Sequence, residues 1–114
     1  MDTQEARSHM LDLAHEVQVI VEGWRARKRL TGDEKQRLRE IVADARSILA
    51  DAGYPAEGVW RAVQRASLGL DTSFQQVDPH YWDDVSRDLQ GGIETLESLV
   101  SRQAGREADF RIVG

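Results

Sequence analysis

The stretch LTGDEKQRLREIVADARSILADAGYP, residues 30–55, contains one complete helix between two helix boundaries. Thr31 followed three residues later by Glu34 is the capping-box pattern that begins a helix. Gly53 is typical of the residue that ends a helix, and Pro55 suits the first turn of the next one. Between these signals the apolar residues recur every three or four positions, at Leu38, Ile41, Val42, Ala45, Ile48, Leu49 and Ala52. The stretch therefore predicts an amphipathic helix with a short junction at each end.

The segment before this stretch predicts a longer helix, from about Thr3 to Arg29. Its apolar residues form one seam at steps of three and four, at Ala6, Met10, Leu13, Val17, Ile20 and Trp24. Further apolar residues widen this seam to the face expected of a bundle helix, which is broader than that of a two-stranded coiled coil. Because only a short turn separates the two predicted helices, we expect them to pack as antiparallel neighbours.

Two further helices are expected after the stretch. Pro55 begins a shorter one, and a loop follows over about residues 69–77, in which Phe74 is a candidate contact to the core. Asp78 and Pro79 then form the N-cap and the first residue of a fourth helix. The apolar seam of that helix consists of Trp82, Val85, Leu89, Ile93, Leu96 and Val100.

Two features complicate the end of the chain. Gly91 and Gly92 interrupt the fourth predicted helix and together cost it about 2 kcal/mol relative to alanines. They predict either a kink or the close approach of another backbone. In the final segment, AGREADFRIVG, the helical spacing is lost, and Phe110 and Ile112 alternate as they would in an extended strand. Such a segment can add to the sheet edge of another protein or fold back over its own bundle.

These segments predict an all-α protein. We expect an elongated four-helix bundle-like domain with long antiparallel helices over residues 1–103, followed by a short non-helical C-terminal tail over residues 104–114. The first helix would be about 40 Å long, whereas a compact chain of this size has a radius of gyration near 13 Å. We therefore expect this helix to overhang, with its seam covered by a second copy or by a partner.

The charges are unevenly distributed along the chain. The formal net charge of −5 weighs against sequence-independent binding to nucleic acid, which depends on cations meeting phosphates. The basic run RARKR, residues 25–29, is either a patch for phosphates or an acidic partner, or the counterpart of the acidic fourth helix; the second interpretation is favoured. The acidic face of the fourth helix, with Asp83 and Asp84, is a solvated face or a docking surface for a basic partner.

The sequence offers weak signals for chemistry. It has no cysteine, no nucleophile elbow and no glycine-rich phosphate loop. Asp12 with His15, and His80 with Asp83 and Asp84, form only half-sites for a metal. We therefore expect no catalytic residue, no cofactor, no metal and no enzymatic activity.

Residues 48–66 resemble a helix-turn-helix motif, with Gly53 at its turn. The resemblance implies that Arg61 would contact a guanine and Gln64 an adenine in the major groove. Three features oppose it. Leu49 stands at a packing position that is normally a small residue, and the preceding helix is longer than is typical of the motif. Glu57 would also face phosphates, and Trp60 is an unusual residue for a groove.

We therefore predict a protein-interaction module: an adaptor, accessory subunit, inhibitor or immunity-type protein that also self-associates as a homodimer. The seams around Trp24 and Trp82 are expected to contribute to its contacts. The predicted partner-binding residues are Trp60, Arg61, Asp83, Asp84, Phe110 and Ile112. The alternative is a DNA-binding regulator that uses residues 48–66. The absence of cysteine and of any leader or membrane span favours the cytoplasm, and the preference for Arg over Lys favours a bacterial or phage origin.

Overall fold

The computed structural model describes residues 1–27, 29–69 and 80–113, with side chains described as far as Val100. Its elements are α1 (Thr3–Arg27), α2 (Gly32–Ala52), the 3₁₀ turn η1 (Tyr54–Ala56), α3 (Glu57–Leu68) and α5 (Tyr81–Val113). No strand occurs in these ranges, so the predicted all-α class is confirmed. Phe74, Asp78 and Pro79 lie outside the described residues.

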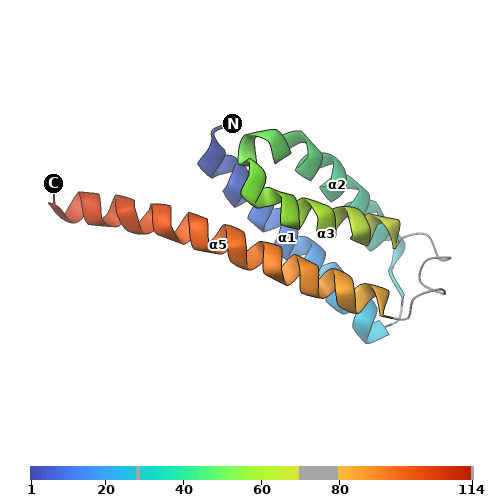
Figure 1. The fold of residues 1–114 in the computed structure, drawn as a ribbon. Coiled ribbons are helices and arrows are strands. Elements are labelled where there is room, and N and C mark those ends of the chain that lie inside the picture. The colour runs from blue at the N-terminus through green and yellow to red at the C-terminus, as the bar shows by residue number, and fades with distance from the viewer. Residues whose placement is uncertain (28, 70–79, 114) are drawn as a thin grey trace.

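The helices pack as a bundle in which α1 lies against both α2 and α5, and α3 lies against α2 and α5 (Figure 1). Contacts between Gln18 and Gln90, and between Arg25 and Asp83, show that α1 and α5 are antiparallel. The molecule measures 57 × 23 × 23 Å and has a radius of gyration of 15.7 Å. The expected elongation is therefore present.

The overhanging helix is α5 and not α1, so that prediction was wrong. The core-facing residues of α1 are buried along its length, from Ala6 to Val21, because α2, α3 and α5 cover that side. The C-terminal end of α5 instead extends beyond the other helices (Figure 1). At about 1.5 Å per residue α5 is about 50 Å long, which is longer than its neighbours.

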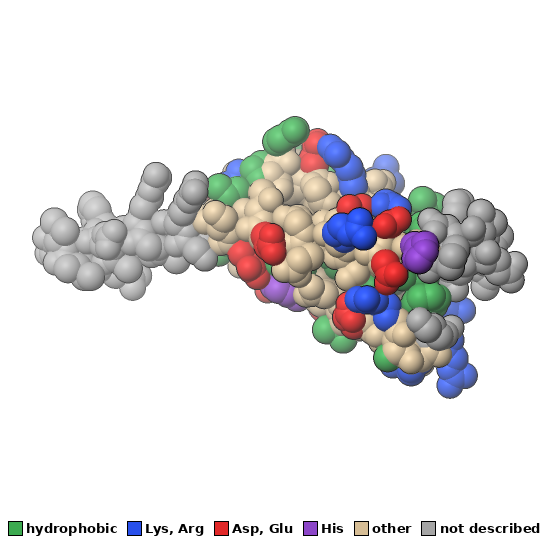
Figure 2. All heavy atoms as spheres, turned by 60° about the horizontal axis from the view of Figure 1, so that its bottom comes forward, with side chains coloured by type: hydrophobic (Ala, Val, Ile, Leu, Met, Phe, Trp, Pro, Cys, Tyr) green, Lys and Arg blue, Asp and Glu red, His purple; other side chains and the backbone are tan. Residues whose placement is uncertain are grey.

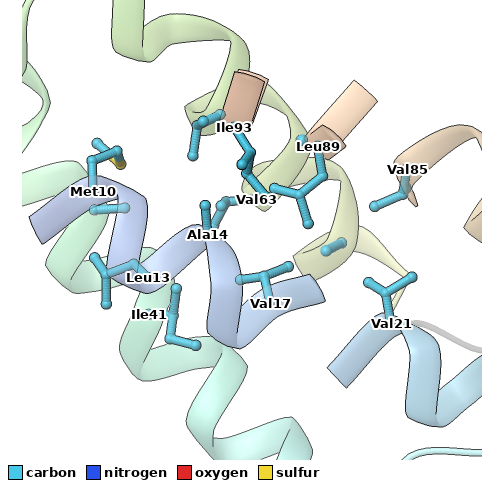
Figure 3. Packing of buried hydrophobic residues seen from close by; sticks show 14 of the residues in the cluster. Met10, Leu13, Ala14, Val17, Val21, Ile41, Val63, Val85, Leu89 and Ile93 are labelled. Carbon is cyan, nitrogen blue, oxygen red and sulfur yellow. The ribbon is translucent and has the colours of Figure 1, made fainter. Parts of the chain in front are cut away.

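The four helices share one hydrophobic core (Figure 3). Met10, Leu13 and Val17 of α1 are buried, as is Ile41 of α2, and Figure 3 shows Val63 of α3 near Leu89 and Ile93 of α5. No polar or charged side chain is buried among the described residues. The apolar spacing of the sequence therefore identifies the core face of each helix.

Trp82 is buried in this core, contrary to the expectation that its seam contributes to a contact surface, whereas Trp24 is half-buried and packs against the core. Their rings stack with centroids 5.2 Å apart, and Trp82 is 1% exposed. Tyr81 adds an edge-to-face contact to Trp82. Because Trp82 is enclosed, its seam is not available to a partner.

The prediction of a non-helical backbone for the tail was also wrong, because α5 continues to Val113. The segment contains Arg, Ala and Glu, which are good helix formers, and it has no proline. A lone extended segment would lack a neighbouring strand to satisfy its hydrogen bonds. The side chains of Phe110 and Ile112 lie outside the described ones, and the division between residues 1–103 and 104–114 stays a prediction.

Candidate protein-interaction surface

The corner between α2 and α3 is closed by backbone hydrogen bonds and by one side chain from α1. Gly53 has φ 80° and ψ −172°, a conformation that is essentially restricted to glycine. Its N–H donates to the Leu49 carbonyl over 3.0 Å, and its carbonyl accepts from the Ala56 N–H over 3.0 Å. Nε of Arg7 donates to the Ala52 carbonyl over 2.9 Å and so satisfies one of the last carbonyls of α2. The predicted C-cap at Gly53 is confirmed.

The side chains at this corner point outward to different degrees. Tyr54 is 81% exposed, which is unusual for so large an aromatic residue. The Arg61 side chain is 70% exposed and places Nη2 3.2 Å from Oε2 of Glu57. Trp60 is half-buried and packs against the core, so it presents only part of its ring to solvent. Of the residues predicted from sequence, the structure therefore brings Arg61 and Trp60 to the corner.

Helix α5 forms the other side of the corner through its paired glycines. A Cβ at Gly92 would lie 2.8 Å from both the backbone N and Cγ2 of Val59, and 3.1 Å from the carbonyl carbon of Gly58. Of the two explanations for the glycine pair, the close approach of another backbone is therefore confirmed for Gly92. Gly91 differs, because a Cβ there would meet no atom within 4 Å.

A shallow cavity of about 300 Å³ lies where the corner meets α5. It is lined by Tyr54, Pro55, Glu57, Gly58, Arg61, Gly91, Gly92 and Thr95, which we call the corner surface. It combines an exposed aromatic ring, an exposed guanidinium and a stretch of backbone without side chains. Tyr54 was missed in the sequence, where its position between Gly53 and Pro55, outside any helix face, is the signal that could have identified it.

The acidic side chains of α5 pair with cations of the same molecule. Oδ1 of Asp83 lies 3.2 Å from Nε of Arg25, and Oδ1 of Asp84 lies 3.8 Å from Nη1 of Arg87. Arg27, a second residue of the RARKR run, pairs with Glu34. On the face shown in Figure 2, acidic and basic side chains are intermixed. These pairs agree with the intramolecular interpretation of the basic run.

Two of the three histidines lie near a carboxylate. Nε2 of His15 lies 3.5 Å from Oε1 of Glu97, and Nδ1 of His80 lies 3.8 Å from Oδ2 of Asp83. Within the described ranges, no three His, Asp or Glu side chains gather closely enough to hold a metal ion.

The shifted pKa values belong to contacts that stabilise the fold. Hydrogen bonds from Arg37 hold the pKa of Glu16 below its ordinary value, and the backbone N–H of Thr31 does the same for Glu34. Burial raises the pKa of Tyr81, whose hydroxyl donates to the Arg65 carbonyl. The causes are an ion pair between helices, a helix cap and burial in the core.

Comparison with known proteins assigns no function to this geometry. No known protein family, no characterised protein and no solved structure matches the chain. In the part of the chain that the structure describes, no helix is both long enough and apolar enough to cross a membrane. The surface of this molecule is therefore the remaining guide to its function.

Proposed function

We propose that this chain is a non-enzymatic protein-interaction module that binds a partner protein on the corner surface. The observation that carries the proposal is the exposed ring of Tyr54 beside the exposed guanidinium of Arg61. A few residues provide most of the binding energy at protein interfaces, and these are enriched in tyrosine, tryptophan and arginine. An adaptor, accessory subunit, inhibitor or immunity-type protein would use such a surface.

The local energetics favour an exchange of contacts at Arg61. Its pair with Glu57 is exposed and spans four residues of one helix, so it contributes only about 0.3–0.5 kcal/mol. A carboxylate or carbonyl of a partner can replace Glu57 at little cost. Gly91 supports the same interpretation, because a partner can approach the α5 backbone there without meeting a side chain of that residue.

The remaining parts of the proposal concern assembly and location. The end of α5 that extends past the bundle is a surface on which a second copy can pack, which supports a homodimer. Asp83 and Asp84 are proposed as further contacts, together with Phe110 and Ile112 of the extended end. The lack of cysteine supports action in the cytoplasm. Light-scattering mass measured over a range of concentrations tests the homodimer.

The corner surface is tested with tagged variants in quantitative affinity capture from a cell extract. Tyr54→Ala and Arg61→Ala remove the two exposed side chains, and Leu68→Ala is the control because Leu68 is also exposed on α3 but lies outside the corner surface. We expect a specific protein that wild type and Leu68→Ala retain and that the two corner variants bind at least about tenfold more weakly, a loss of about 1.4 kcal/mol. Equal retention of every bound protein by Tyr54→Ala would contradict the proposal.

The alternative function, DNA binding, is favoured by the exposure of Arg61 and Gln64 on α3. Two contacts oppose it: Glu57 pairs with Arg61, and Arg65 Nη1 lies 2.6 Å from Oδ2 of Asp88. The two functions are separated by titrating the protein with random duplex DNA at low and rising salt. A DNA-binding protein should bind the duplex with an affinity that falls steeply as salt rises. An interaction module should show no binding to the duplex even at low salt.

A further inference from the structure

A second exposed apolar position lies on the hairpin of α1 and α2, away from the corner surface. Val19 is 72% exposed although it lies in the middle of α1. It lines a cavity of about 370 Å³ between the two helices, together with Glu16, Ile20, Asp33, Glu34 and Arg37. We call this the Val19 cavity. Its two apolar residues are adjacent, and the other four are charged.

Two ion pairs between α1 and α2 flank this cavity. Oε2 and Oε1 of Glu16 accept from Nε and Nη2 of Arg37 over 2.6 and 2.8 Å. Arg27 and Glu34 form the second pair, which lies against Gly23. A bidentate pair of this kind fixes side-chain geometry as well as adding energy. The charged residues around Val19 are therefore already ordered, which reduces the entropy lost when a partner binds.

The charge around the cavity is negative. Its lining contains three carboxylates and the guanidinium of Arg37, which is already bound to Glu16 and to Glu40. Arg27 adds a second guanidinium at Glu34, so carboxylates still outnumber cations around the cavity. Helical spacing places Asp12 on the same face of α1 as Val19, and Asp44 on the same face of α2 as Arg37. An anionic membrane or nucleic acid would be repelled here, whereas a cationic protein segment would be attracted.

We propose that the Val19 cavity docks a helix of a partner protein that carries an aliphatic side chain between Lys or Arg residues. Two antiparallel helices present a groove into which the side-chain ridge of a third helix packs. The aliphatic side chain contacts Val19 and Ile20, and the flanking cations meet Asp33 and the neighbouring carboxylates. An amphipathic helix supplies this arrangement through residues spaced by three and four.

This surface is separate from the corner surface. Asp33 and Arg37 lie in the first two turns of α2, whereas Tyr54 follows its last residue. The helix rise places the two surfaces about 25 Å apart along α2. A helix docked at the Val19 cavity therefore leaves the corner surface accessible, and this proposal goes beyond the function proposed above and does not depend on it.

The test uses synthetic helical peptides as probes. The first carries one Leu between Lys residues, the second replaces the Lys residues by Glu, and the third replaces the Leu by Gln. Binding is followed by NMR through the methyl signals of Val19 and Ile20. We expect the first peptide to shift these signals with an affinity that weakens as salt rises, and the other two to bind at least about tenfold more weakly.

Variants locate the site. Val19→Gln removes the apolar contact without adding charge and should weaken binding of the first peptide at least about tenfold, followed through the Ile20 methyl signal. Because Val19 is exposed the substitution leaves the fold intact, which far-ultraviolet circular dichroism checks. Leu68→Gln and Tyr54→Ala are controls that should leave the affinity unchanged. Binding that is unchanged in Val19→Gln, equal binding of the Glu peptide, or no methyl shift at millimolar peptide overturns the proposal. Methyl shifts that depend on protein concentration alone would assign the cavity to a second copy and also overturn it.

Discussion

The two helix junctions of this molecule differ in what they do with their side chains. At the junction of α1 and α2, Oγ1 of Thr31 accepts from the Glu34 N–H over 3.1 Å, and Oε1 of Glu34 accepts from the Thr31 N–H over 2.9 Å. Arg27 pairs with the same carboxylate, and Leu30 is buried. At the α2–α3 corner no side chain of the junction caps a helix, and Tyr54 faces solvent.

The difference separates a junction that is stabilised by its own residues from one that depends on distant ones. The α1–α2 junction needs only the local Thr31 and Glu34 pattern. The corner relies on Arg7 from α1 for a hydrogen bond and on Gly92 of α5 for space. Its exposed side chains are not needed to close it, so they are available to a partner. Three predictions test this contrast, beginning with the largest expected effect.

Replacing Gly92 by Ala should destabilise the corner most. The added Cβ would lie 2.8 Å from the backbone N of Val59, and backbone atoms cannot move aside as a flexible side chain can. We expect a loss of about 3 kcal/mol in the free energy of unfolding, measured by denaturant titration. Gly91→Ala is the matched control, and it should gain about 1 kcal/mol from helix propensity. A Gly92→Ala protein as stable as wild type would show that α3 and α5 can separate without cost.

Replacing each junction glycine by Ala sharpens the comparison. Gly53 has a backbone conformation that alanine adopts only with strain, so Gly53→Ala should lose about 2 kcal/mol. Gly32 begins α2 with no atom near its missing Cβ, and Gly32→Ala should stay within about 0.5 kcal/mol of wild type. Thermal and chemical unfolding of the two variants measures the difference. Equal losses would mean that the two junctions tolerate strain alike.

The smallest effect concerns the pH dependence of the capped junction. The Thr31 N–H lowers the pKa of Glu34 below its ordinary value, so the stability from this contact is present above that ordinary pKa and is lost as pH falls through the lower folded pKa. Glu34→Gln keeps an oxygen acceptor but no titrating group. Unfolding measured from about pH 7 to about pH 3 should show a shallower acid loss for this variant than for wild type. If the unfolding free energy fell equally with pH in both proteins, Glu34 would not contribute to the acid sensitivity.

Local patterns in the sequence predicted the parts of the fold that local interactions determine. The Thr31 and Glu34 capping box is present, and α1 ends two residues before the expected Arg29. The apolar spacing also identified most of the buried residues, although Val42, Leu49 and Val100 of the expected seams are only half-buried. The third helix was expected at Pro55, which instead lies in a 3₁₀ turn before Glu57.

The features that the sequence left open or mispredicted depend on contacts between distant segments. The spacing of Gly91 and Gly92 allowed a kink or a close approach, and only the position of Val59 decides between them. Trp82 was expected at a contact surface because nothing local shows that Trp24 encloses it. The exposure of Tyr54 and Val19 was missed for the same reason. Whether a residue is exposed depends on which distant segments pack over it.

The bond from Arg7 to Ala52 has a mechanical consequence for the hairpin of α1 and α2. Together with the Glu16–Arg37 and Arg27–Glu34 pairs, it joins the two helices at three levels along their length. Sliding one helix past the other by a single turn, about 5.4 Å, would break all three contacts at once. The three contacts therefore hold the two helices in one register. This register fixes the distance between the Val19 cavity and the corner surface before any partner binds.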